Sequence, residues 1–286
     1  MKSQIKVTII INCFNGASFI NDCVSSVIAQ SYSNWELVFW DNLSTDCSEK
    51  NLKKFKDKRI KYYKASKHTN LPKARNLALE KASSNFVAFL DIDDSWHKDK
   101  LKLQVAEIKK IRNFSFCYTK TKEIYNNLQP LKKNNKILQK IKNFFLSLET
   151  IDRLLICNYI YFSSVLINTN QLNGKKKFND KYEQAEDYDL LLRLSLNGRV
   201  IYINNELTSY RIHNDNLTNS QYSKSFTESL EILNNYKKNK YSHLGKVLNY
   251  IKLSELFFSK RNYLSSFKYF IHAFISFLYF GLLNVI

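Results

Sequence analysis

The sequence predicts an α/β fold in which a mostly parallel, Rossmann-like central sheet is flanked by helices. Short apolar runs alternate with amphipathic segments over the first hundred residues, a pattern typical of parallel sheets. The clearest run, Phe86–Leu90, ends abruptly at the carboxylates of Asp91, Asp93 and Asp94. Because ligands of open α/β sheets bind beyond the carboxyl ends of such strands, we expect the binding site at this point.

Four strands and three helices are expected before Asp91. Val7–Asn12 and Trp35–Trp40 are rich in β-branched or aromatic residues, as strands are. Pro72 should open a helix, since proline is favoured in the first turn. The other expected elements are strands at 59–63 and 86–90, an amphipathic helix over 19–28, and a short helix capped by Thr45.

A fourth helix is expected after Asp91–Asp94, the acidic run. Leu101, Val105 and Ile108 recur at helical spacing, and Asp94 or Ser95 is a suitable N-cap. Residues 120–142 are rich in Lys and Asn and are predicted to be a solvated excursion. The later elements expected are a strand at 159–167, a helix at 186–196 ended by Asn197-Gly198, and short strands at 199–203 and 208–212.

The tail of the chain is expected to be a helical extension. We place a first domain at residues 1–220 and the extension at 221–286. Residues 269–286 contain no Asp, Glu, Lys or Arg and lie at the lower limit for a membrane-spanning helix. Because basic residues precede them, a helix lying in the membrane interface is favoured, and packing on the first domain or on a partner chain is the alternative.

Composition bounds the class of protein. With 286 residues and 44% hydrophobic residues, the chain is long enough for one large domain and an appendage. Its formal net charge of +19 attracts nucleic acid, anionic lipid or phosphorylated substrates without distinguishing between them. Few Gly and Pro residues exclude a low-complexity composition.

The cysteines indicate a reducing compartment. There are five, an odd number, and they are scattered without a C-x-x-C pair. This pattern favours free thiols over disulfides or a zinc site. The chain begins directly with a predicted strand and shows no signal peptide, so we expect a cytoplasmic protein.

The acidic run indicates a metal–diphosphate site. Asp91 and Asp93 are two residues apart, so on an extended chain their side chains point the same way. A hard divalent cation relieves the repulsion of two such carboxylates, and it usually takes further ligands from phosphate and water. The structural alternative is that Asp93 or Asp94 only caps the next helix, which needs one acid and leaves the others unexplained. Neither a G-x-G-x-x-G nor a G-x-x-x-x-G-K-[ST] motif is present, so a nucleotide would be held differently.

Six motifs occur in an order that resembles a known family. They are Thr8–Asn15, Asp41, Ala74–Ala78, Asp91–Asp94, Glu186–Arg193 and Tyr210–His213. As a set, over roughly residues 5–217, they resemble the family 2 glycosyltransferases, GT-A fold enzymes that build bacterial surface polysaccharides. Each motif alone would be weak. The resemblance implies a GT-A fold and a metal-dependent, inverting glycosyltransferase.

The resemblance implies a pocket for a nucleotide-sugar. A UDP-sugar is favoured, and GDP- and dTDP-sugars are the alternatives. Asp41 is expected to bind the uracil or the ribose, and the backbone from Cys13 to Asn15 is expected to line the same pocket. The family usually has Pro-x-Tyr-Asn where this chain has Asn-Cys-Phe-Asn, so an aromatic ring is retained but the proline is lost. Arg75 and Asn76 are expected to face the nucleotide. A turn or capping role for Asp41, and a surface position for Arg75, are the structural alternatives.

The resemblance also implies how the metal and the acceptor are handled. Asp93 is expected to ligate Mn²⁺ or Mg²⁺, with Asp91 on the ribose or a metal-bound water, and His213 on the metal or the diphosphate. Arg211 would pair with a phosphate or a carboxylate. Asp187 resembles the general base of inverting members, and Glu186 and Asp189 compete for that role.

The expected acceptor is a lipopolysaccharide, capsule or lipid-linked glycan at the inner membrane surface. This location would make the protein peripheral at the inner face of the plasma membrane, and no nucleic-acid partner is expected. A nucleotidyltransferase is disfavoured because the chain lacks a Gly-rich triphosphate loop. A non-catalytic basic module would need a concentrated basic stripe and no ordered acids. An inactive member of the family is a further alternative.

Overall fold

The computed structural model describes residues 4–125, 145–172, 177–213 and 221–282. The chain divides into two compact units, and each is described by itself. The first contains described residues 4–125, 160–172, 177–180 and 193–213, and the second contains 145–159, 181–192 and 221–282. The second unit thus includes segments that the sequence analysis placed with the first domain, and the boundary after residue 220 stays a prediction.

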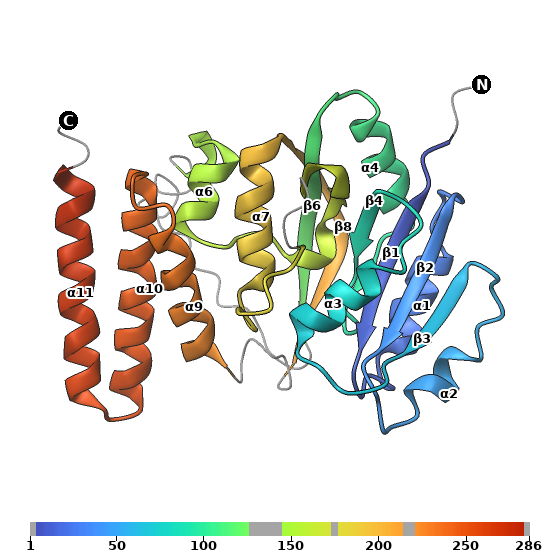
Figure 1. Cartoon of the computed structure of the whole chain (residues 1–286), viewed down its shortest axis with the longest axis horizontal. Coiled ribbons are helices and arrows are strands. Elements are labelled where there is room, and N and C mark those ends of the chain that lie inside the picture. The colour runs from blue at the N-terminus through green and yellow to red at the C-terminus, as the bar shows by residue number, and fades with distance from the viewer. Residues whose placement is uncertain (1–3, 126–144, 173–176, 214–220, 283–286) are drawn as a thin grey trace. The chain divides into compact units, whose positions relative to one another are not determined.

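Four parallel strands form the first half of the sheet in the first unit (Figure 1). They are β1 (Val7–Cys13), β2 (Trp35–Asp41), β3 (Ile60–Lys64) and β4 (Phe86–Phe89). β1 lies between β2 and β4, and β3 pairs with the far side of β2. The four predicted strands are confirmed to within one or two residues. The carboxyl ends of β1, β2 and β4 therefore lie at one edge of the sheet.

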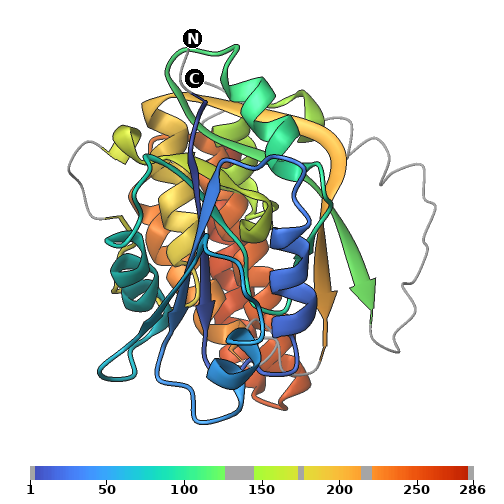
Figure 2. The ribbon, with the colours of Figure 1, turned by 90° about the vertical axis from the view of Figure 1, so that its right-hand side faces the viewer.

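The second half of the sheet is mixed. The described residues form one eight-stranded sheet in the order β3-β2-β1-β4-β7-β6-β8-β5. The strands added here are β7 (Leu166–Asn168), β6 (Phe114–Tyr125), β8 (Arg199–Ile212) and β5 (Ser95–Trp96). β7 runs antiparallel to both β4 and β6, so β6 and its parallel partner β8 run in the direction of β4 (Figure 2). The carboxyl end of β8 is thereby at the same edge as that of β4.

Helices of the first unit follow the predicted amphipathic segments. They are α1 (Ile20–Ile28), α2 (Ser48–Leu52), α3 (Leu71–Leu79) and α4 (Lys100–Ile108). In α3 the Asn70 side chain accepts a hydrogen bond from Lys73 N, and Pro72 occupies the first turn as expected. In α2 the cap position is Cys47, so the prediction of a Thr45 cap is wrong.

The prediction that Asp94 or Ser95 caps the helix after the acidic run is also wrong. Ser95 and Trp96 form β5, which pairs with Ser209 and Thr208 of β8, and α4 begins only at Lys100. Ser95, which local propensity favours as a helix cap, is therefore used in pairing with a distant strand. The carboxylates of the run are left for other roles, and the capping alternative no longer explains them.

Three later elements differ from the predictions. Residues 120–125 belong to the long strand β6, whereas the rest of the predicted excursion, 126–142, lies outside the described residues. In the predicted strand 159–167, residues 162–164 form the 3-10 turn η1 (Phe162–Ser164) before β7. The two short strands expected at 199–203 and 208–212 are the single strand β8, because pairing with β6 continues through both. A second 3-10 turn, η2 (Thr169–Leu172), follows β7.

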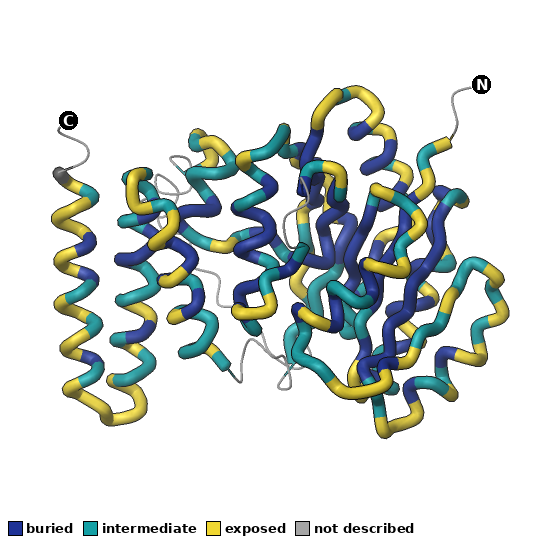
Figure 3. The backbone as a smooth tube through the Cα atoms, viewed as in Figure 1, coloured by how far each residue is buried: buried dark blue, intermediate teal, exposed yellow. Residues whose placement is uncertain are grey.

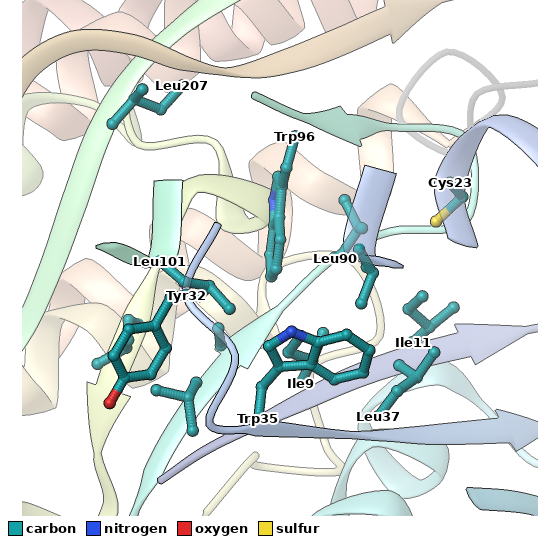
Figure 4. Close-up of a cluster of buried hydrophobic side chains, with 14 of the residues drawn as sticks. Ile9, Ile11, Cys23, Tyr32, Trp35, Leu37, Leu90, Trp96, Leu101 and Leu207 are labelled. Atoms are coloured by element: carbon teal, nitrogen blue, oxygen red, sulfur yellow. The ribbon is translucent and has the colours of Figure 1, made fainter. Parts of the chain in front are cut away.

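A buried hydrophobic core lies between the sheet of the first unit and its helices. Ile9 and Ile11 of β1, Leu37 of β2 and Leu90 after β4 meet Cys23 of α1 in this cluster (Figure 4). Each large apolar side chain buried in this way stabilises the fold by about 1.5–3 kcal/mol. All five cysteines are free, in agreement with the sequence analysis.

A buried carboxylate joins β1, β2 and β3 near the amino ends of these strands. Glu36 of β2 is 3% exposed and accepts hydrogen bonds from Lys61, Thr8 and Ser83. Burial by itself raises the pKa of Glu36, but these hydrogen bonds outweigh burial and hold the pKa well below its usual value. Since the folded pKa is depressed, the stabilisation is complete above the unfolded pKa of about 4.3 and is lost as the pH falls below it.

We expect Glu36→Gln to lower the free energy of unfolding at pH 7 by about 2 kcal/mol, because charged hydrogen bonds to a buried group are lost. The difference from the wild type should shrink as the pH falls from about 5 towards 3. Urea denaturation at a series of pH values measures both effects. Glu49→Gln is the matched control, because Glu49 also pairs with two lysines but at the exposed surface, and it should change little. A difference that is the same at pH 7 and pH 3 would contradict this account.

The second unit is helical. It contains α6 (Thr150–Ile156), the start of α7 (Glu186–Asn197), α9 (Tyr222–Asn234), α10 (Lys240–Ser259) and α11 (Tyr263–Leu282). Gly245 of α10 packs so closely on α6 that an added Cβ would lie 2.0 Å from the carbonyl oxygen of Leu155. The helical tail was predicted. Within the described part of the chain, no helix has the length and apolar character needed to cross a membrane.

Candidate active site

The three carboxylates after β4 are placed differently in the first unit. Asp91 and Asp93 reach solvent, with side chains 39% and 21% exposed. Asp94 is 1% exposed, and its backbone N–H closes a turn by donating to the carbonyl of Asp91. Two acids of the run are therefore available to a ligand, and the third points into the protein.

Asp94 anchors the run to neighbouring segments. One carboxylate oxygen accepts from the Ser163 hydroxyl at 2.5 Å, and the other accepts from the backbone N–H of Arg211 at 3.0 Å. Burial, and then the charges of Asp91 and Asp93, raise the pKa of Asp94 well above its usual value. The carboxylate thus joins the acidic run to η1 and to the carboxyl end of β8, on which His213 follows.

Ser163→Ala should misplace the acidic run. The Ser163 hydroxyl also accepts from the backbone N–H of Asp91 at 3.1 Å, so the change removes two hydrogen bonds at once. We expect a 10- to 100-fold loss of kcat, the order seen when groups that orient site ligands are removed, together with about 1–3 kcal/mol of stability. Steady-state kinetics and thermal unfolding measure these effects. Ser164→Ala is the control, because this buried neighbour donates to the carbonyl of Tyr161 instead; equal losses in both variants would contradict the assignment.

Asp93 and His213 face each other. The ring nitrogen Nε2 of His213 lies 3.1 Å from a carboxylate oxygen of Asp93, and the Phe19 ring lies 5.0 Å from the imidazole. Burial, followed by the charge of Asp91, raises the pKa of Asp93 above its usual value. The Arg211 side chain donates to the carbonyl of Asp93 and pairs with Asp22, so its partner in this structure is a carboxylate.

These residues fit a divalent cation that is shared with a substrate. A carboxylate and an imidazole nitrogen converge at one point, and the repulsion between Asp91 and Asp93 would be relieved by a positive charge there. In the part of the chain that the structure describes, no group of three or more His, Cys, Asp or Glu side chains is arranged to hold a metal. Mg²⁺ and Mn²⁺ in such sites take their other ligands from phosphate oxygens and water. Asp93 and His213 are therefore the side chains that would hold the ion.

Arg75 lies behind the acidic run and is 4% exposed. It donates to Asp91 at 2.8 Å and lies over the ring of Phe162 at 4.7 Å. The guanidinium is thereby fixed beside a carboxylate of the site. Asn76, one residue on, uses its amide on the backbone N–H and carbonyl of Phe178, both at 2.9 Å. In this structure Asn76 holds a neighbouring segment, and its contact with a nucleotide stays a prediction.

Asp41 ends β2 at the same edge of the sheet but is fully buried. Its carboxylate accepts from the backbone N–H of Ser44 and from the hydroxyl of Tyr62, both at 2.7 Å. Burial, and then the bond to Asp41, raises the pKa of Tyr62. Asp41 therefore has the turn-stabilising role that the sequence analysis gave as its structural alternative. A nucleobase would reach this carboxylate only if Ser44 or Tyr62 moved away from it.

The segment from Cys13 to Asn15 lies beside that turn. Cys13 is buried with its sulfur near Ser48, and burial raises the pKa of the thiol. Asn15 adopts a positive φ of 53°, a conformation that Asn tolerates well, and its side chain accepts from Thr45 N. Phe14 is 49% exposed and its ring lies 4.2 Å from that of His68. The chain therefore presents an exposed aromatic pair at the place where the resemblance implies a nucleobase.

Asp187 belongs to the second unit and is described apart from the acidic run. Among the three acids that begin α7, Glu186 and Asp189 are 2% and 6% exposed, whereas Asp187 is partly exposed. One Asp187 oxygen accepts from the backbone N–H of Tyr188 at 2.6 Å. Burial thus favours Asp187 over its two competitors for contact with a substrate, and its role as a base stays a prediction.

Sequence reasoning missed Glu228, which fixes the start of α7. Its carboxylate accepts hydrogen bonds from the backbone N–H groups of Glu183, Gln184 and Ala185, at 2.8 to 3.1 Å. These donors lie just before the first residue of α7, so the carboxylate fixes the segment that leads into the helix. Ser163 and His68 were also missed, because none of the three stands in a recognisable motif and each acts through a segment far away in the chain.

The sequence matches the family described as "Glycosyl transferase family 2" over residues 8–165. This range includes β1, β2, Arg75 and the whole acidic run. The chain belongs to glycosyl transferase family 2. It is therefore a glycosyltransferase, as the order of its motifs predicted.

Two curated relatives match over most of their own length. One is the "UDP-Glc:alpha-D-GlcNAc-diphosphoundecaprenol beta-1,3-glucosyltransferase WfgD" of Escherichia coli, 31% identical over 86% of this chain and 92% of that protein. Another is the "Putative teichuronic acid biosynthesis glycosyltransferase TuaG" of Bacillus subtilis, 31% identical over 76% of this chain and 82% of that protein. The family 2 chain described here thus matches relatives of similar size.

Solved structures show the same fold. S. aureus TarS 1-349 in complex with UDP-GlcNAc superposes with a TM-score of 0.72, 18% identity and coverage of 94% of this chain and 79% of that one. The mannosyltransferase PcManGT of Pyrobaculum calidifontis, in complex with GDP-Man and Mn²⁺, gives a TM-score of 0.68 at 13% identity, covering 96% and 74%. These likenesses confirm the GT-A fold of this family 2 member.

Proposed function

We propose that this family 2 chain is a metal-dependent, inverting glycosyltransferase that moves a sugar from a UDP-sugar to a hydroxyl of a lipid-linked, capsule or lipopolysaccharide glycan. The observation that carries the proposal is the solvent-facing pair Asp91 and Asp93, with His213 beside it, at the carboxyl edge of the sheet. A structure of similar fold is described with UDP-GlcNAc and another with GDP-Man and Mn²⁺. Both descriptions agree with a nucleotide-sugar donor, and the second also agrees with a divalent ion.

The donor would lie along the edge where β1, β2 and β4 end. The exposed Phe14 ring, tilted against the ring of His68, suits the face of a pyrimidine base. Arg75 and Asp91 form a fixed ion pair beside the acidic run, and Asp91 keeps an exposed oxygen edge that suits a ribose hydroxyl. Asp93 and His213 would hold Mn²⁺ or Mg²⁺. When bound, this ion would neutralise negative charge on the departing diphosphate.

In the proposed reaction the acceptor oxygen forms a bond to the anomeric carbon while the bond from that carbon to the diphosphate breaks. Attack comes from the face opposite the diphosphate, so the anomeric configuration inverts. The hydroxyl proton passes to the carboxylate of Asp187, and the nucleoside diphosphate leaves with the bonding electrons. Glu228 holds the backbone before α7 and thereby fixes the position of Asp187 within its own unit.

The acceptor is proposed to be membrane-borne. WfgD is described as acting on a diphosphoundecaprenol-linked GlcNAc, as is WfaP of Escherichia coli, which is 29% identical over 78% of this chain and 84% of that protein. An acceptor of this class would place the enzyme peripherally at the inner face of the plasma membrane. The chain's net charge of +19 favours such a surface, because the lipids of the cytoplasmic leaflet are anionic.

A transfer assay tests the proposal. The full chain is incubated with Mn²⁺, with UDP-glucose, UDP-GlcNAc, UDP-galactose or GDP-mannose in turn, and with a GlcNAc-diphospholipid analogue. Mass spectrometry should detect addition of one hexose or hexosamine from a UDP-sugar, and NMR should give the inverted anomeric configuration. Product with the donor's configuration retained, or transfer that EDTA leaves unchanged, would contradict the proposal.

A further inference from the structure

Helix α11 buries small side chains and exposes large apolar ones, which is unusual for a helix on a solvated surface. The residues buried towards α10 are small, namely Ser266, Ala273 and Ser276. The exposed ones are large and apolar, with Leu264 at 88%, Phe267 at 64% and Phe270 at 60%. A helix on a solvated surface shows the reverse pattern, with its apolar stripe facing the core.

The packing of α11 on α10 uses serine hydroxyls and stacked rings. The Ser254 hydroxyl of α10 donates to the carbonyl of Ser266 at 2.9 Å, and Tyr250 stacks on Tyr269 and His272. The two helices lie side by side, and most exposed positions are on the side of α11 turned away from α10 (Figure 3). The exposed Tyr279 instead stacks on His243 of α10. The outer face of α11 comprises Tyr263, Leu264, Phe267, Phe270, Ile271, Phe274, Ile275, Phe277 and Leu278.

The outer face continues onto the end of α10. There Phe258, 63% exposed, packs its ring against that of Tyr263 at 5.4 Å. A contiguous exposed apolar surface of this size marks a binding site for a protein or a membrane. Its aromatic residues include Tyr263 at the start of the helix, and tyrosine favours the boundary between apolar and aqueous phases.

The charges of this segment favour a membrane over a second protein as the binding partner. Residues 256–286 contain no Asp or Glu but do contain Lys260, Arg261 and Lys268. In a symmetric contact with a second copy, these cations would gain no acid partner from the same segment. An anionic bilayer supplies both an apolar layer for the aromatic rings and negative headgroups for the cations.

We propose that the outer face of α11, together with the Lys260–Arg261 turn, docks the protein on an anionic lipid bilayer with the helix lying in the plane of the membrane. The 20 residues of α11 give a contact about 30 Å long. The proposal rests on the helix alone and holds whether or not the transferase reaction is as described above. It agrees with the prediction of an interfacial tail and adds the face and the residues that make contact.

Vesicle flotation with the full chain tests the docking. We expect binding to vesicles that contain phosphatidylglycerol, at least about tenfold weaker binding to pure phosphatidylcholine, and a loss of about tenfold in the double variant Lys260→Glu/Arg261→Glu. The variant Phe267→Ser/Phe270→Ser/Phe274→Ser should lose binding. The matched control is Leu196→Ser, which alters a 62% exposed leucine in the first unit and should bind like the wild type. Equal binding by the triple-serine variant and the wild type would overturn the proposal.

A fluorescent reporter keeps the test decisive if the serine variant unfolds. Phe274→Trp preserves size and apolar character, and brominated phosphatidylglycerol vesicles should quench its emission, whereas Leu196→Trp should be unaffected. Absence of quenching at position 274 would overturn the proposal. So would a stable oligomer, measured by sedimentation velocity, that persists in the presence of vesicles and is dissociated by the Phe274→Ser change.

Discussion

Replacing Asp93 with asparagine is expected to reduce sugar transfer by at least about 10²–10³-fold, the loss typical of removing one group that stabilises charge in the transition state. The isosteric amide keeps the shape of the acidic run but removes the negative charge that faces His213. Initial rates with saturating UDP-sugar and Mn²⁺ measure the effect. The variant should also lose most of the difference between Mn²⁺ and EDTA that the wild type shows.

Asp99→Asn serves as the control for that experiment. Asp99 lies six residues further along, is hydrogen-bonded to Ser31 and is not part of the acidic run, so its substitution should leave kcat within a factor of about two. Both variants should have circular dichroism spectra like the wild type. An Asp93→Asn enzyme that retains normal turnover would remove this residue from the account of catalysis.

The second large effect is expected at the start of α7. Asp187→Asn should lower kcat by about 10²–10⁴-fold, because no carboxylate is left to take the acceptor's proton. The affinity for the nucleotide should stay unchanged, since the proton is removed from the acceptor and not from the donor. Single-turnover transfer and calorimetric titration of UDP separate these two quantities.

Two neighbours make the Asp187 test specific. Glu183→Gln changes an acid four residues earlier that pairs with Lys224, and it should leave kcat nearly intact. If the loss of activity followed Asp189→Asn instead of Asp187→Asn, the buried carboxylate would be the better candidate for the base. Loss of UDP affinity in Asp187→Asn would contradict a role confined to the acceptor.

The first half of the fold was predictable because its signals are local. The strands β1, β2 and β4 are mostly apolar runs followed by polar residues, so each could be found from the residues within it. The family resemblance rested on short motifs whose order along the chain is visible in the sequence. The observed strands confirm the first prediction, and the match over residues 8–165 confirms the second.

The errors arose where distant segments compete with local propensity. Ser95 and Trp96 have the composition of a helix start, but they pair with Ser209 and Thr208 more than a hundred residues away. The strand β8 was predicted as two short strands because its middle, around Asn204 and Asn205, is polar. Its pairing with β6 is irregular at these two residues but resumes at Glu206, so the two halves belong to one strand.

The site residues also divide into those that local spacing reveals and those that depend on distant packing. Sequence reasoning found Asp91 and Asp93 because the chemistry of paired acids is visible at a spacing of two. It did not anticipate that Asp94 is buried against Ser163 or that Asn76 binds the backbone of Phe178, since both depend on where η1 and residue 178 pack. The exposed apolar face of α11 was visible as composition, but which of its residues face α10 required coordinates.

Titration calorimetry of UDP binding, with Mn²⁺ and with EDTA, tests the central claim most directly: that the acidic run after β4 holds a nucleotide through a divalent ion. We predict that UDP binds the wild type at least about tenfold more tightly with Mn²⁺, that Asp93→Asn abolishes this gain, and that GDP binds more weakly. UDP affinity that is equal with Mn²⁺ and EDTA, or that is unaffected by Asp93→Asn, would contradict it.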